Sequence, residues 1–161
     1  MEIIIGTLEN QEGISKFAKL LKLLQGARLF DKKYCFEDSG KKCIFELERY
    51  YIEKPIKESI FLFFKNYRCG TIKSILEISP VLKVEESKKG YEDFEMDFDE
   101  RKNTLSVGTS KHTFHLFLTG NTKLRIYDVG DVNKEGKGYY SKKYWAKLNR
   151  MIEEISLNVP K

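Results

Sequence analysis

The sequence is poor in the residues that build disulfide frameworks and metal sites. Its 161 residues include three cysteines and two histidines. The cysteines, Cys35, Cys43 and Cys69, are odd in number and form no C-x-x-C pair. This pattern argues against both a disulfide framework and a zinc ribbon. We therefore expect reduced structural thiols, and we assign no metal ligand and no cofactor.

Long apolar runs and targeting features are also missing. No stretch approaches the roughly 18 to 20 continuous apolar residues that cross a bilayer. The short apolar run 3–5 turns polar at Gly6 and Thr7, which fits neither a signal peptide nor a transit peptide. We expect a cytoplasmic protein without membrane contact. The length predicts one compact domain over residues 1–161, with an internal division near 85–90 as the alternative.

Catalytic motifs are absent as well. The sequence has no Gly-x-Ser-x-Gly, no His-Glu-x-x-His and no cysteine with an evident histidine partner. His112 and His115 are three apart on an expected strand, which sends their side chains to opposite faces. A general base at either position is the alternative to a hydrogen-bonded packing role. We assign no catalytic residue, and the pattern favours a protein that is not an enzyme.

The first half of the chain predicts alternating strands and helices. We expect strands over 2–8, 28–37, 42–52 and 72–79, and helices over 14–24 and 56–67. Gly26 and Pro80 are placed to stop the elements before them. A buried strand competes with the helix over the unbroken apolar run 60–64. The predicted order matches a ferredoxin-like βαββαβ unit.

The second half predicts a β-meander followed by a C-terminal helix. The strands are expected over 91–98, 104–109, 111–118 and 123–129. The helix begins at Ser141, a suitable N-cap, and ends by Asn158. Its apolar side carries Trp145, Leu148, Ile152 and Ile155. The predicted fold class is α+β, mainly antiparallel sheet with about three helices.

Charge is segregated along the chain. Residues 85–100 hold eight acidic residues and two lysines, a net charge of −6. The remainder holds 27 basic and 16 acidic residues, a net charge of +11, and the total of +5 conceals both. Such segregation predicts surfaces that select charged partners.

The acidic window contains a strictly alternating strand. Phe94, Met96 and Phe98 face one way, and the carboxylates of Asp93, Glu95, Asp97 and Asp99 face the other. One interpretation is an edge strand whose charge keeps it soluble. A calcium site is another, but carboxylates along one strand face do not converge on an ion unaided. The third is a docking surface for a basic partner.

A basic, aromatic segment follows at residues 134–150. Its six basic residues and two of its tyrosines form a candidate nucleic-acid or phosphate site: Lys134, Lys137, Tyr139, Tyr140, Lys142, Lys143, Lys147 and Arg150. Cations beside aromatic rings suit phosphate neutralisation and base stacking. A solvated helix start with core aromatics is the competing interpretation.

Our leading hypothesis is a small non-enzymatic protein that occludes a macromolecular partner. Asp93, Glu95, Asp97 and Asp99 would contact a basic surface on a protein partner. The size and charge layout suit an immunity protein of a toxin system or a phage-encoded inhibitor of bacterial defence. The alternative is a nucleic-acid or nucleotide-binding domain that uses residues 134–150. The sequence assigns no oligomeric state.

Overall fold

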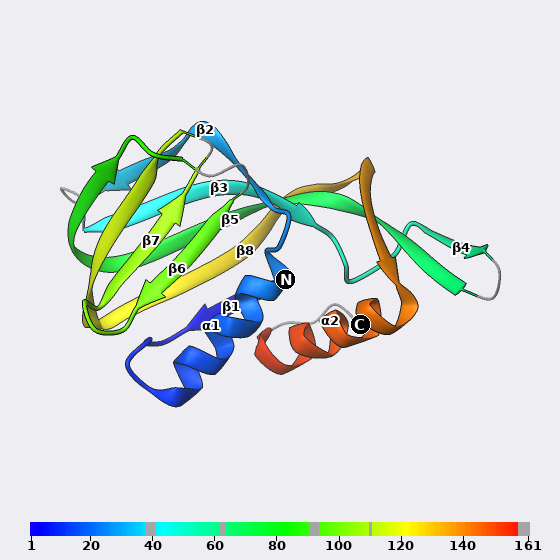
Figure 1. Cartoon of the computed structure of the whole chain (residues 1–161), viewed down its shortest axis with the longest axis horizontal. Helices are drawn as coiled ribbons and strands as arrows, with labels where there is room; N and C mark the ends of the chain where they lie inside the picture. The colour runs from blue at the N-terminus through cyan, green and yellow to red at the C-terminus, as the bar shows by residue number, and fades with distance from the viewer. Residues whose placement is uncertain (38–40, 62–63, 91–93, 110, 158–161) are drawn as a thin grey trace.

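A computed structural model describes residues 1–37, 41–61, 64–90, 94–109 and 111–157. Its elements follow in the order β1 (Glu2–Ile5), α1 (Gln11–Leu23), β2 (Arg28–Glu37), β3 (Lys42–Tyr50), β4 (Lys57–Phe61), β5 (Phe64–Ser87), β6 (Glu95–Asp99), β7 (Thr104–Gly108), β8 (Thr113–Ser141) and α2 (Lys142–Ile155) (Figure 1). The described chain is mostly antiparallel sheet with two helices. The predicted α+β class is therefore confirmed in its coarse form.

Two very long strands form the spine of the sheet. β5 has 24 residues, β8 has 29, and they pair antiparallel along most of their length. β3 and β4 pair with the other side of β5, while β1 and β7 pair with the other side of β8. The sheet order is β2-β3-β5-β8-β7-β6, with β1 and β4 off this path. Register shifts between Cys69 and Lys73, and between Ser79 and Lys83, interrupt the ribbon.

The two helices lie side by side below the curved sheet (Figure 1). α1 buries Phe17, Leu20 and Leu23, and α2 buries Leu148 and Ile152, at the three-and-four spacing of an amphipathic helix. These side chains join one core with apolar residues of the strands. The helices are therefore held by tertiary packing on the sheet as well as by local propensity.

The predicted Ser141 cap and the predicted stop at Gly26 are confirmed, whereas α1 begins at Gln11 and not at residue 14. Ser141 is the N-cap of α2, and its hydroxyl accepts the backbone N–H of Tyr144 at 3.3 Å. α1 ends at Leu23, and Gly26 follows with a φ of +80°. Glycine adopts this left-handed conformation without steric cost, which explains its position after the helix.

The predicted helix over 56–67 is wrong. Residues 57–61 and 64–68 form a β-hairpin, in which Lys57 pairs with Arg68 and Phe61 with Phe64. The apolar residues of this segment fit both the helical and the strand period. They form a strand because β5 pairs with the end of β8. With this helix replaced by strands, neither the ferredoxin-like first half nor the third helix is confirmed.

Two predicted strand boundaries are also wrong. β5 does not stop at Pro80 but extends to Ser87, into the segment 85–90 where an internal division was the alternative prediction. The strands predicted over 111–118 and 123–129 form one continuous β8. The predicted meander is confirmed where β6 pairs with β7 and β7 with the start of β8.

Candidate functional site

The acidic strand predicted from the sequence is β6, and its alternation is confirmed in the described part. Glu95 and Asp97 are exposed, whereas Phe94 and Met96 are buried on the opposite face. Asp93 was predicted to belong to the same row and lies outside the described residues. We call the exposed face formed by Glu95 and Asp97 the acidic edge.

Asp99 also has a local structural role. It is half-buried, and its Oδ1 accepts the backbone N–H groups of Arg101 at 3.0 Å and Lys102 at 3.2 Å. These bonds satisfy the turn that leads from β6 to β7. Local side-chain to backbone bonding of this kind is typical of aspartate in turns. Asp99 therefore holds this turn with one carboxylate oxygen, and its predicted part in partner binding stays a hypothesis.

β6 lies at the end of the sheet. Within the described residues it pairs with β7 alone, in a register that places Glu95 opposite Gly108 and Asp97 opposite Ser106. The outer side of an end strand carries main-chain N–H and C=O groups that no sheet neighbour uses. The acidic edge therefore combines charge with main-chain hydrogen-bonding capacity.

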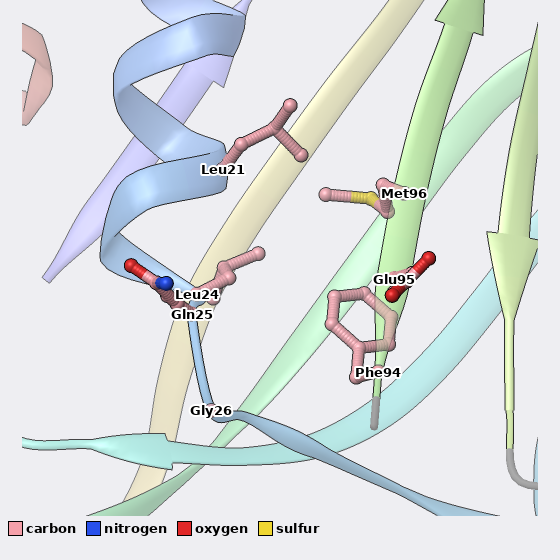
Figure 2. A pocket seen from close by; sticks show the side chains of 7 residues that line it. All are labelled: Leu21, Leu24, Gln25, Gly26, Phe94, Glu95 and Met96. Atoms are coloured by element: carbon pink, nitrogen blue, oxygen red, sulfur yellow. The ribbon is translucent and has the colours of Figure 1, made fainter. Parts of the chain in front are cut away.

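The inner face of β6 packs on α1 and leaves a pocket of about 320 Å³. Phe98 meets Phe17 of α1 edge to face, with ring centroids 6.3 Å apart. Beyond this contact, Leu21 of α1 and Met96 of β6 point toward each other across the pocket (Figure 2). The residues that line the pocket are Leu21, Leu24, Gln25, Gly26, Phe94, Glu95 and Met96. Apolar walls therefore lie directly behind the acidic edge.

A polar row crosses the outer face of the sheet from β6. Strand register places Asp97 opposite Ser106, Ser106 opposite His115, and His115 opposite Glu85. The Ser106 Oγ and His115 Nδ1 atoms are 2.8 Å apart, a hydrogen bond between half-buried side chains. This bond gives His115 the hydrogen-bond partner that its predicted packing role requires. A role of His115 as a general base stays a hypothesis.

His112 lies apart from this row. Its Nδ1 is 2.6 Å from the Oε1 of Glu86, and its ring stacks near Phe114 at a centroid distance of 6.2 Å. The two histidines contact different partners, and His112 lies just before β8 and not on the strand predicted to carry both. No group of three metal-ligating side chains occurs in the described ranges.

The basic segment is divided between two elements. Lys134, Lys137, Tyr139 and Tyr140 belong to β8, although the side chain of Lys137 lies outside the described part. Lys142 and Lys143 begin α2, and Lys147 and Arg150 follow along it; all four are exposed. Lys143, Lys147 and Arg150 share one helical face because they are separated by four and three residues.

Trp145 of this segment has a structural role. Its Nε1 donates a hydrogen bond to the carbonyl oxygen of Ile52 at 2.8 Å, and its ring packs on Tyr67 at 4.8 Å. Asn149 donates to the same carbonyl at 2.9 Å. These contacts attach α2 to the chain between β3 and β4 and to β5.

A second hollow, of about 470 Å³, lies where β8 passes into α2 and faces the end of α1. We call it the tyrosine groove. It is lined by Lys22, Gln25, Tyr139, Tyr140, Ser141, Tyr144 and Leu148. Lys22 and Gln25 were not predicted, since nothing in the sequence relates α1 to residues 139–148. Burial raises the pKa of Tyr140, so this hydroxyl stays protonated near neutral pH.

Strand pairing adds two further cations beside this groove. Lys57 pairs with Arg68, and Arg68 pairs with Tyr139, so the three residues form one cross-strand row. Tyr139 and Lys57 are exposed, and Arg68 is half-buried. This row was missed because residues 56–67 were predicted to be helical.

The acidic edge and the basic segment lie at different ends of the molecule. β6 and β7 flank one end of the β5–β8 ribbon, whereas residues 138–141 pair with the opposite end, at Asn66 to Cys69 (Figure 1). The two regions are thus separated along the ribbon, although Gln25 at the end of α1 lines both the pocket behind β6 and the tyrosine groove.

A buried ionic cluster lies between these ends. The guanidinium of Arg49 donates to both carboxylate oxygens of Asp128, at 3.1 and 2.7 Å, and to Glu53 and the carbonyl of Tyr50. Asp128 also accepts from the Ser74 hydroxyl at 2.7 Å and from the amino group of Met1 at 2.9 Å. Burial alone would raise the pKa of Asp128, but Arg49 and these hydrogen bonds together hold it below its ordinary value.

Two of the three cysteines are buried, protonated thiols. Cys43 and Cys69 are buried, and burial raises their pKa values to about 12 and about 11. A thiol that stays protonated near neutral pH is a poor nucleophile. Cys35 is exposed on β2, and all three are free.

Compared with known proteins, the chain matches no family model, and neither curated proteins nor solved structures give a significant match. Among the described residues, no helix has the length and apolar character needed to span a membrane. We therefore infer function from the geometry of the acidic edge and the tyrosine groove.

Proposed function

We propose that this protein binds a macromolecular partner through β6 and thereby occludes a basic surface of that partner. One observation carries the proposal. β6 is an end strand that combines exposed carboxylates on its outer face with a pocket behind its inner face that is lined by both apolar and polar residues. An extended segment added to such an edge gains main-chain hydrogen bonds, while alternate side chains supply specificity.

The chemistry of the partner follows from the alternation. A strand added beside β6 places every second side chain on the face of Glu95 and Asp97, where lysine or arginine is favoured. The side chains between them face the opposite way, toward the pocket lined by Leu21 and Met96. The preferred segment thus alternates cationic and apolar residues.

Occlusion of a basic surface indicates the class of protein to which this chain would belong. A partner with such a surface loses access to its own anionic ligands when the surface is covered. This action would suit an immunity protein of a toxin system or a phage-encoded inhibitor of bacterial defence. The proposal does not assign an enzymatic activity.

A pair of peptides tests this mode of binding. One labelled peptide carries lysine at every second position between valines, and the other has the same composition with its lysines contiguous. Fluorescence anisotropy at low salt is expected to show tighter binding of the alternating peptide. The double variant Glu95→Lys/Asp97→Lys should weaken this binding about tenfold or more, because attraction becomes repulsion.

The matched control is Asp131→Lys, which changes an exposed carboxylate of β8 away from β6. It is expected to leave peptide affinity close to that of the unmodified protein. Equal affinity for the two peptides, or unchanged binding after reversal of Glu95 and Asp97, would contradict the proposed role of β6.

A further inference from the structure

The tyrosine groove has the features of a second binding site, next to the pocket behind β6, with which it shares Gln25. It lies between the end of α1 and the junction of β8 and α2, and its volume of about 470 Å³ exceeds that of the pocket behind β6. Its lining combines the aromatic side chains of Tyr139, Tyr140 and Tyr144 with the cation of Lys22.

The rings are both exposed and supported from below. Tyr139 is 64% exposed and Tyr144 is 37% exposed, although large aromatic side chains are usually mostly buried. Tyr144 stacks on Tyr140 with centroids 6.1 Å apart, and Tyr140 meets Tyr50 edge to face at 6.0 Å. Three rings therefore form a column that ends at the surface with Tyr144. A ring held in this way loses little conformational entropy when a planar group stacks on it.

Cations surround these rings. Lys22 lines the groove, and the cross-strand row brings Arg68 and Lys57 beside Tyr139. Lys142 and Lys143 follow the groove residue Ser141 and are exposed. The ligand that suits exposed rings flanked by cations has planar faces joined by regularly spaced negative charges.

We infer that the tyrosine groove binds single-stranded nucleic acid. Bases stack on Tyr139 and Tyr144, and Lys22, Arg68 and Lys57 neutralise the adjoining phosphates. A duplex is disfavoured because its base faces are already stacked. An acidic protein segment would satisfy the cations but would leave the exposed rings without a planar partner.

Titration with labelled oligonucleotides tests the inference on the whole chain. Anisotropy is recorded with a single strand of about ten pyrimidine nucleotides, a length within the site sizes of single-strand binders. Affinity should fall steeply as salt rises. Tyr139→Ala and Tyr144→Ala should each weaken binding roughly 5- to 100-fold, the loss expected for one stacked base. Arg68→Glu should weaken binding and reduce the salt slope by about 1 or more.

Matched controls separate this site from nonspecific attraction. Lys123→Glu reverses an exposed cation of β8 outside the tyrosine groove, and Phe36→Ala removes a ring that is 37% exposed, as Tyr144 is. Both should leave the affinity nearly unchanged. Equal losses in controls and groove variants would overturn the inference. So would competition by polyglutamate or duplex DNA as strong as that by unlabelled single strand.

Variants at each site distinguish failure of the peptide-binding proposal from failure of the oligonucleotide-binding inference. Glu95→Lys/Asp97→Lys is expected to leave oligonucleotide affinity unchanged or slightly raised, because neither residue lines the tyrosine groove and the change removes negative charge from the neighbouring strand. Tyr139→Ala should leave peptide binding unchanged. Oligonucleotide binding that depended on Glu95 and Asp97, with no effect of Tyr139 or Tyr144, would contradict the inference for the tyrosine groove.

Discussion

Arg49 is the largest of the fully buried side chains in the described structure. All five of its N–H donors meet acceptors on Asp128, Glu53 or the carbonyl of Tyr50. A buried charge is tolerated only when it is paired and hydrogen-bonded in this way. The cluster joins β3, the following turn and β8, so its integrity bears on stability and not on ligand binding.

Replacement of Arg49 by methionine is expected to destabilise the fold strongly. The change keeps an apolar stem but leaves Asp128 and Glu53 as neighbouring buried carboxylates without their shared cation. Loss of one partner from a buried pair costs about 3 to 5 kcal/mol of unfolding free energy. Urea denaturation near neutral pH measures this loss. Arg125→Met, which removes an exposed arginine paired with Glu2, is the control and should cost less than about 1 kcal/mol; equal losses would contradict the assigned role of Arg49.

Asp128 predicts the direction of acid sensitivity. Its pKa in the folded protein is lowered, so the unfolded chain binds the proton more readily. The contribution to stability is complete above the unfolded pKa of about 3.9 and is lost as pH falls through the lower folded value. Unfolding free energies measured between about pH 6 and pH 3 should show this decline. The Asp128→Asn variant should be less stable at the upper end of this range and should show a shallower decline; an unchanged slope would contradict the assignment.

The sequence identified part of each site at the level of single residues. The exposure of Glu95 and Asp97 was predictable from strict alternation, because a strand turns successive side chains to opposite faces. The role of Asp99 was not, since its carboxylate bonds to the backbone of the turn that follows β6. Lys22 and Gln25 carry no local signal for the tyrosine groove, which forms only when α1 packs beside the end of β8.

At the scale of elements, α1 shows how tertiary contact reverses a local preference. Gly13 lies within the first turn of α1, and its N–H donates to the side chain of Asn10 at 2.8 Å. Alanine is the better helix former by up to about 1 kcal/mol. A Cβ at position 13 would, however, lie 1.6 Å from the carbonyl oxygen of Thr7. The backbone clash outweighs the gain in helix propensity.

Gly13→Ala should therefore lower the melting temperature instead of raising it. The control is Ser15→Ala, on an exposed position of the same helix, which should leave the melting temperature unchanged or slightly higher. Calorimetry or circular dichroism melts of both variants measure the two shifts. A stabilising Gly13→Ala would show that the Thr7 segment moves freely away from α1.

The hairpin of β4 and β5 shows how a local pattern in the sequence led to a wrong prediction. Apolar residues between Ile56 and Tyr67 satisfy helical spacing and also form an unbroken run that suits a strand. The strand wins because Tyr67 and Arg68 pair with Tyr140 and Tyr139 of β8. Those partners are distant in the sequence, and no short window contains them.

At the scale of the whole molecule, charge is separated into two ends. The long β5–β8 ribbon carries the β6–β7 pair at one end and the β4 hairpin with the start of α2 at the other (Figure 1). At the end of α1 the two regions approach each other, since Gln25 lines both the pocket behind β6 and the tyrosine groove. The two binding proposals therefore concern neighbouring surfaces with different lining residues, one for a basic protein segment and one for single-stranded nucleic acid.

The sequence alone determined the features that depend on neighbours within one or two turns of chain. These are the apolar sides of α1 and α2, the Ser141 cap, the stop at Gly26 and the alternation of β6. Only the tertiary structure decided the continuity of β5 and β8, the row that joins Arg68 to Tyr139, and the two hollows at the end of α1. The physical reason is that periodicity and capping depend on neighbouring residues. Strand pairing and cavities instead join segments that are far apart in the sequence, and no local pattern in either segment shows that the two will meet.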